Sequence, residues 1–182
     1  MVSALDEARF GADHFALFGL PPAFRVDARL LDERFRELQA RIHPDRFAQA
    51  GESERRVSLQ WATRVNEAYR CLKDPLARAR YLLALAGHPV DVKNNAAMPP
   101  EFLMEQMEWR EAVAEARAAR QTDELEQLRH RVRQRMNAGH ERLAELLDDR
   151  RDTPAAADAI RRLMFLEKLL SEIDDGLAEL EE

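Results

Sequence analysis

The chain has little cysteine and glycine and no long apolar run, and each scarcity removes a class of protein. Its 182 residues include a single Cys, so an internal disulfide is excluded, and no Cys or His cluster has the spacing of a zinc site. With only 6 Gly and a charged fraction of 34%, the composition favours helices over a β-sandwich. There is no run of about 18 apolar residues, and no basic segment followed by an apolar one at the N-terminus. We therefore expect an all-α protein in the cytoplasm, with no membrane contact, metal or cofactor.

The net charge of −6 divides unevenly along the chain. Residues 1–90 carry 14 basic and 12 acidic side chains, whereas residues 91–182 carry 14 and 22. The first half is therefore not a strong binder of polyanions, and the acidic second half disfavours nucleic acid unless its charge is sharply segregated. We expect no nucleic-acid partner.

A proline interrupts an amphipathic helix in the stretch ARIHPDRF. The apolar residues before it recur at helical spacing and predict one buried face: Leu31, Phe35, Leu38 and Ile42. Pro44 removes a backbone N–H and pushes His43 out of the α conformation, so the helix stops there. His43 and Asp45 are then left on a solvent-exposed loop at the end of the helix.

The segments around this loop predict further helices in the first half of the chain. A short apolar segment, His14 to Leu20, ends at two prolines, and Asp27 can cap the long helix that precedes the loop. A second amphipathic helix follows the loop, with one apolar face: Ser58, Ala62, Val65, Tyr69 and Leu72. Asp74 and Pro75 then provide the cap and the first residue of a short closing helix.

The second half predicts a separate bundle. Turn-forming residues from Gly87 to Pro100 show no sustained periodicity and indicate a linker. Three helical stretches follow, near residues 99–119, 122–148 and 155–181. The last two carry apolar stripes: Leu125, Leu128, Val132, Leu143 and Leu146, and then Leu163, Leu166, Leu170, Ile173, Leu177 and Leu180. Short polar connections make neighbouring helices antiparallel, which predicts a three-helix bundle.

The order of these elements, with His-Pro-Asp between two long helices, resembles the J-domain of DnaJ-type co-chaperones. The stretches HFALFGLPPAF and FRELQARIHPDRF are similar to the HscB branch, and FLMEQMEWRE and RRLMFLEKLL are similar to its C-terminal domain. The resemblance covers nearly the whole chain. It implies a J-domain over residues 1–87, a linker over 88–98 and a scaffold-binding three-helix bundle over 99–182.

The resemblance also implies a function in iron–sulfur cluster assembly. The chain would not be an enzyme but a co-chaperone that stimulates the ATPase of a DnaK-type, HscA-like chaperone. It would deliver an IscU-like scaffold protein to that chaperone. The alternative is a general J-domain protein whose bundle recruits another client.

The chaperone-binding residues follow from the resemblance. They are the loop and the basic positions near it: His43, Pro44, Asp45, Arg36, Arg41 and Arg46. Asp45 would pair with an arginine near the interdomain linker of the chaperone. Arg36 and Arg41 match basic positions of the family, but Glu37 stands where a basic residue is common, so the extent of the basic face is open. The other interpretation of these arginines is a solvated helix face with acidic neighbours.

The scaffold-binding residues are expected on the helix that opens at Pro99. Its core stripe comprises Phe102, Trp109, Val113 and Ala116. A second apolar set lies roughly 100–160° from the centre of that stripe, bordered by acids. The predicted scaffold-binding residues are this set, its border and Phe165, which lies off the apolar stripe of its own helix: Leu103, Met104, Met107, Glu108, Glu111, Glu115 and Phe165. The other interpretation is burial against a neighbouring helix or the linker.

Two other classes of protein fit the sequence less well. An enzyme with His43 as base and Asp45 as its orienting partner would need a third group and a pocket, and two residues on one exposed turn cannot both point into a cleft. A nucleic-acid binder would need a basic surface with base-reading residues, which the acidic second half opposes. An effect on the ATPase of a DnaK-type chaperone distinguishes the co-chaperone from both.

Overall fold

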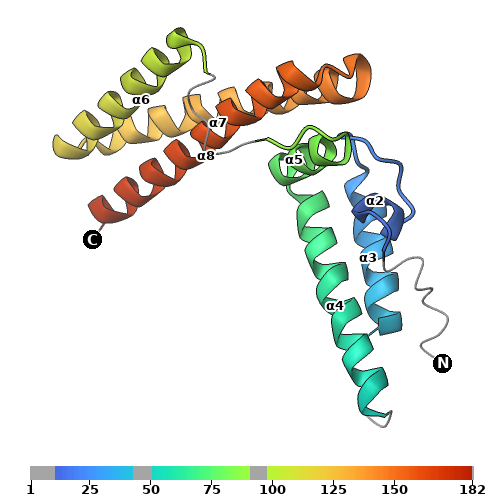
Figure 1. The fold of residues 1–182 in the computed structure, drawn as a ribbon. Helices are drawn as coiled ribbons and strands as arrows, with labels where there is room; N and C mark the ends of the chain where they lie inside the picture. The colour runs from blue at the N-terminus through green and yellow to red at the C-terminus, as the bar shows by residue number, and fades with distance from the viewer. Residues whose placement is uncertain (1–10, 43–50, 91–97, 182) are drawn as a thin grey trace. The chain divides into compact units, whose positions relative to one another are not determined.

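The computed structural model describes residues 11–42, 51–90 and 98–181, and every regular element in these ranges is a helix (Figure 1). The expected all-α fold is therefore confirmed. The chain divides into two compact units, Met1–Leu82 and Leu83–Glu182. The division falls inside α5 (Pro75–Leu85), a few residues before the linker expected at 88–98. Since residues 91–97 lie outside the described residues, the bounds of the linker stay a prediction.

The first unit contains α2 (His14–Leu17), α3 (Ala28–Ile42), α4 (Glu52–Lys73) and most of α5. The predicted caps are present. Asp27 Oδ1 accepts hydrogen bonds from the backbone N–H groups of Arg29 and Leu30, at 2.9 and 3.2 Å, at the start of α3. Asp74 Oδ1 accepts from the N–H of Ala77 at 2.6 Å, directly before Pro75 opens α5.

The helices α3 and α4 lie side by side as a hairpin in Figure 1, and their apolar faces share one core with α2. The core residues are Phe15, Leu17, Phe18, Leu20, Leu31, Leu38, Ile42, Trp61, Val65, Ala68 and Leu72. The buried face of α4 is turned slightly from the predicted one, because Trp61 and Ala68 are buried while Ala62 and Tyr69 are half-buried. Tyr69 instead stacks on the half-buried Phe35 of α3, with ring centroids 3.9 Å apart.

The second unit is a bundle of α6 (Pro100–Ala118), α7 (Thr122–Ala144) and α8 (Thr153–Glu181). A π-helical turn, η4 (Glu145–Arg150), continues α7, and Arg151 then adopts a left-handed backbone with φ of 53°. Asp152 Oδ1 accepts from the N–H of Ala155 at 3.1 Å as α8 begins. The three helices correspond to the predicted ones within a few residues, apart from the π-helical turn.

The core of this bundle corrects one expectation about α8. The residues of α8 that enter the central cluster are Phe165, Leu169, Ile173 and Leu177, at successive i, i+4 positions. Leu166, Leu170 and Leu180 belong to the apolar stripe that the sequence predicted as the core face of α8. In the structure they are only partly buried, and they pack against the edge of the central cluster. α8 packs against both α6 and α7, so its buried surface is wider than one stripe. The prediction that Phe165 lies outside the core is therefore wrong.

Candidate partner-binding surfaces

The last turn of α3 is held by a hydroxyl from α4. Ser58 is a buried polar residue in the core of the first unit, and its Oγ donates a 2.7 Å hydrogen bond to the backbone carbonyl of Ile42. Ile42 is the last described residue of α3 and directly precedes His43 in the sequence. Ser58 thus provides this carbonyl with a hydrogen-bond partner inside the core, where buried polar groups need one. The predicted binding residues His43, Pro44, Asp45 and Arg46 lie outside the described residues.

The opposite end of the α3–α4 hairpin is closed by polar side chains. Asp32 Oδ1 accepts hydrogen bonds from Lys73 Nζ at 2.6 Å and from the Tyr69 hydroxyl at 2.9 Å. The hydrogen bonds from Lys73 and Tyr69 lower the pKa of Asp32 below its ordinary value, and the bond to Asp32 raises the pKa of Lys73. Contacts at both ends thus set the register of α3 against α4.

The predicted basic residues that the structure describes are exposed on α3. Arg36 and Arg41 are both exposed, and Arg36 Nε donates to the backbone carbonyl of Asp32 at 3.2 Å. Glu37, the acidic residue at a commonly basic position, is 3.1 Å from Arg34 Nη1. The two partners lie three residues apart on the same helix, and such exposed pairs are weak. Arg34 nevertheless places a positive charge beside Glu37.

On α6 the predicted second apolar face is exposed. Leu103, Met104 and Met107 have 39%, 63% and 70% of their surface accessible, and they are among the few large apolar side chains exposed in the described residues. We call these three residues the anchor face. Its predicted acidic border is exposed as well: Glu108, Glu111 and Glu115. Among the described residues, no neighbouring helix buries the anchor face; burial against the linker is untested, because residues 91–97 lie outside the described residues.

Phe165 has a different environment from the anchor face. Only 8% of its surface is accessible, and its ring meets that of Phe102 edge-on, with centroids 5.8 Å apart and planes at 88°. The guanidinium of the exposed Arg110 lies over the same ring, 5.6 Å from its centroid. Phe165 is thus a core residue whose ring makes a cation–π contact with Arg110. A role for it in scaffold binding stays a prediction.

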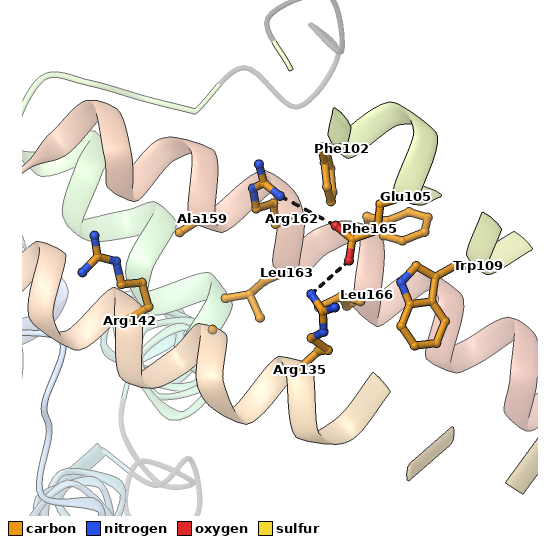
Figure 2. A pocket seen from close by; sticks show the side chains of 11 residues that line it. Phe102, Glu105, Trp109, Arg135, Arg142, Ala159, Arg162, Leu163, Phe165 and Leu166 are labelled. Atoms are coloured by element: carbon orange, nitrogen blue, oxygen red, sulfur yellow. Dashed lines mark ion pairs between the residues drawn. The ribbon is translucent and has the colours of Figure 1, made fainter. Parts of the chain in front are cut away.

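Glu105 joins the three helices of the bundle and was not singled out from sequence. One oxygen of its half-buried carboxylate is 3.0 Å from Arg135 of α7, and the other is 3.9 Å from Arg162 of α8 (Figure 2). Its only sequence signal is its position three residues after the core residue Phe102, on the flank of the core stripe. Ser58 was also missed, because it was counted as one member of an apolar stripe.

The first unit is a hairpin of two long helices on either side of a His-Pro-Asp sequence, and a three-helix bundle follows it. This arrangement defines a J-domain co-chaperone with a C-terminal helical bundle. The family model for the HSCB C-terminal oligomerisation domain matches residues 98–174. A co-chaperone protein HscB homolog of an Azoarcus strain is 58% identical over 93% of this chain and 96% of its own length. The chain belongs to the HscB family of co-chaperones.

Solved structures agree with this assignment. Chaperone HscB from Vibrio cholerae is 40% identical to this chain and superposes on it with a TM-score of 0.83. The match covers 93% of this chain and 99% of the Vibrio chain. Human co-chaperone protein HscB is 28% identical over 90% of this chain and 81% of its own, with a TM-score of 0.84. The expected function is confirmed: the chain is a co-chaperone of iron–sulfur cluster assembly that works with a DnaK-type chaperone and a cluster scaffold.

Among the described residues there is neither a candidate membrane span nor a candidate metal cluster. None of their helices combines the length and the apolar character that crossing a membrane requires. No group of three or more His, Cys, Asp or Glu side chains among them is arranged to hold a metal ion.

Proposed function

We propose that the partner chaperone is HscA-like, that the scaffold is IscU-like, and that the two units of this chain divide the work between them. The J-domain stimulates the chaperone through His43, Pro44 and Asp45, which we call the motif, and the bundle binds the scaffold through the anchor face. The observation that carries the proposal is the anchor face itself. Three large apolar side chains remain exposed on α6 while the core stripe of that helix is buried.

On the chaperone side, the support comes from the end of α3. The Ser58–Ile42 hydrogen bond holds the carbonyl of the residue that directly precedes His43 in the sequence. Asp45 pairs with an arginine of the chaperone, and Arg36, Arg41 and Arg46 add long-range attraction to an acidic surface. Such an activator must bind the hydrolysing state of the chaperone more tightly than the resting state, because only a difference in affinity shifts an equilibrium. The chain itself supplies no catalytic group.

On the scaffold side, the anchor face and its border have separate roles. Exposed methionines adapt their shape to a partner, and burial of such anchors supplies most of the affinity of an interface. The carboxylates of Glu108, Glu111 and Glu115 select a partner with basic residues and speed its association. Phe165 supports this surface from the core through its contact with Phe102.

The first prediction tests the motif directly. His43→Gln should abolish stimulation of an HscA-like ATPase, because the motif makes the contacts that differ between chaperone states. Binding of an IscU-like scaffold should be unchanged, since the anchor face belongs to the other unit. The measurements are steady-state ATP hydrolysis with and without the variant, and scaffold titration by calorimetry. His130→Gln, a substitution of an exposed histidine on α7, is the matched control. Undiminished stimulation by His43→Gln would refute the role of the motif.

A further inference from the structure

The bundle of the second unit contains a cavity that shares Phe102 and Phe165 with the proposed scaffold-binding region and is otherwise not used by the proposed function. It has a volume of about 160 Å³ and lies where α6, α7 and α8 meet (Figure 2). Its apolar walls are Phe102, Trp109, Leu163, Phe165 and Leu166. A cavity of roughly 150 Å³ lined by apolar side chains accepts a single benzene ring. This cavity therefore has room for one aromatic or aliphatic side chain rather than for a larger ligand.

A glycine keeps the walls of the cavity close together. Gly139 of α7 lines it, and a Cβ added there would lie 2.7 Å from Cδ2 of Leu163 on α8. Any side chain at position 139 would force Leu163 to move. The close approach of α7 and α8 thus shapes the floor of the cavity.

The polar part of the lining is mainly cationic. Arg135, Arg142 and Arg162 line the cavity together with a single carboxylate, that of Glu105. Glu105 lies between Arg135 and Arg162, whereas Arg142 and Ala159 lie at the end remote from Trp109 in Figure 2. Arg142 also pairs with Glu145 at 2.8 Å, and about half of its side chain is exposed. The lining therefore carries a net positive charge, because it holds three guanidinium groups and one carboxylate.

The cationic surface continues along α7. Residues 127–140, QLRHRVRQRMNAGH, contain four arginines and no acidic residue, although the second half of the chain is acidic overall. Arg131 lies over the ring of Trp109 at 4.8 Å and, with Arg135, lines a shallower hollow of about 260 Å³ that adjoins the cavity. Viewed along the helix, Arg131, Arg135 and Arg142 lie within roughly 40° of one another. Together these three arginines form a basic edge beside the apolar cavity.

We propose that this cavity and its basic edge bind an acidic peptide segment of a partner protein, with one aromatic or aliphatic side chain inserted between flanking Asp or Glu residues. The inserted side chain would rest on Phe102 and Leu163. Its flanking carboxylates would meet guanidinium groups, which bind carboxylates in a planar, two-pronged geometry. A basic segment would be repelled by the same edge.

This peptide site differs from the anchor face in both position and charge. Met104 and Met107 are exposed on α6 with acidic neighbours, whereas Glu105 and Trp109 of the same helix turn toward the arginines of α7. The two surfaces therefore suit partner segments of opposite charge. The proposal stands independently of scaffold binding by the anchor face.

The test uses the full-length chain and an acetylated, amidated peptide, Asp-Glu-Phe-Glu-Asp, with indole N–H signals followed by nuclear magnetic resonance. The two tryptophans provide an internal control, because Trp109 lines the cavity and Trp61 is buried in the core of the first unit. Titration to millimolar peptide should shift the Trp109 signal and leave that of Trp61 in place. A peptide with Ala for Phe, or with Lys for the four acids, should bind at least about tenfold more weakly.

Three variants decide whether the shift reports this site. Arg142→Gln should weaken binding of the acidic peptide by about threefold or more, and Arg133→Gln, an exposed arginine of α7 outside the lining, should not. Ala159→Met should fill the cavity and remove binding, and a thermal melt shows whether that variant folds. The proposal is overturned if Trp109 does not respond, if the lysine peptide binds equally well, or if Arg142→Gln binds like the parent. Equal binding of the uncharged N-acetylphenylalanine amide would also overturn it, because the flanking carboxylates would then contribute nothing.

Discussion

At the scale of single residues, the most informative contact is the hydrogen bond from Ser58 to the carbonyl of Ile42. It lies in the apolar core, where an unpaired carbonyl costs far more than it does in water. It also lies one residue before His43, so its effect on stability and its effect on the motif can be measured separately.

Ser58→Ala should lower the free energy of unfolding by about 1–2 kcal/mol, because it leaves a buried carbonyl without its partner. Since α3 would then end less rigidly before the motif, stimulation of the chaperone should fall even at temperatures where the variant is fully folded. Chemical denaturation and the ATPase assay measure the two effects. Thr63→Ala is the matched control, since its hydroxyl donates to a backbone carbonyl on the exposed side of the same helix. Full stimulation by folded Ser58→Ala would show that the hydroxyl serves stability alone.

The environment of His14 predicts that the stability of the first unit depends on pH. Its ring stacks on Tyr81 with centroids 4.2 Å apart, and its buried Nδ1 has no hydrogen-bond partner among the described residues. Burial, and then the positive charge of Arg64, hold the pKa of His14 below its ordinary value of 6.5, although Asp13 and Glu67 act in the opposite direction. The folded state therefore binds the proton less readily than the unfolded state.

Because the unfolded chain takes up this proton first, the free energy of unfolding should fall as the pH drops below 6.5, and the contribution of His14 should be complete above that value. His14→Gln removes the titrating group and should flatten the dependence of stability on pH. Denaturation midpoints at about pH 5 and about pH 7.5 give the comparison for parent and variant. An unchanged difference between the two midpoints would assign the pH dependence to other groups.

At the scale of elements, α6 and α8 separate binding from stability. Changing Leu103, Met104 and Met107 together to Ala should weaken scaffold binding at least about tenfold, because the anchors supply most of the affinity. The melting temperature should hardly change, since all three side chains are exposed. Leu59→Ala, which removes an exposed leucine from α4, is the control for loss of apolar surface elsewhere. Retained scaffold affinity in the triple variant would exclude the anchor face.

Phe165 requires its own test because it is buried. Phe165→Ala should lower the free energy of unfolding by about 3–5 kcal/mol, as expected for deletion of a core aromatic ring. Any loss of scaffold binding in that variant must therefore be measured well below its melting temperature. Reduced affinity of the folded variant for the scaffold would support the predicted contribution of Phe165 to the scaffold surface. Unchanged affinity would show that Phe165 contributes to stability alone.

At the scale of the whole molecule, each unit has its own hydrophobic core. A fragment of residues 1–90 should therefore fold and retain some stimulation when the chaperone is in excess. A fragment of residues 96–182 should bind the scaffold without stimulating the chaperone, because it lacks the motif. Circular dichroism melts, the ATPase assay and scaffold titration test these expectations. Failure of both fragments to fold would show that the two units depend on each other.

The sequence alone determined the features that arise from neighbouring residues. Apolar periodicity identified the faces of α3 and α6, and Asp27 and Asp74 marked where helices begin. Pro44 predicted that α3 stops before the loop; the described part of α3 extends to Ile42, and the stop itself stays a prediction. These signals act within about one turn of helix, so a single sequence is enough to read them. The resemblance to the HscB family rested on the same local stretches.

Only the tertiary structure decided which side chains meet across helices. Ser58 could be placed on the buried side of α4, but not opposite the last carbonyl of α3. Glu105 could be counted as one acid among several, but not placed between Arg135 and Arg162. Phe165 was misplaced because its burial depends on Phe102 of a different helix. Periodicity defines which residues share a face of one helix, whereas the rotation and offset of packed helices are set by the fit of all their side chains together.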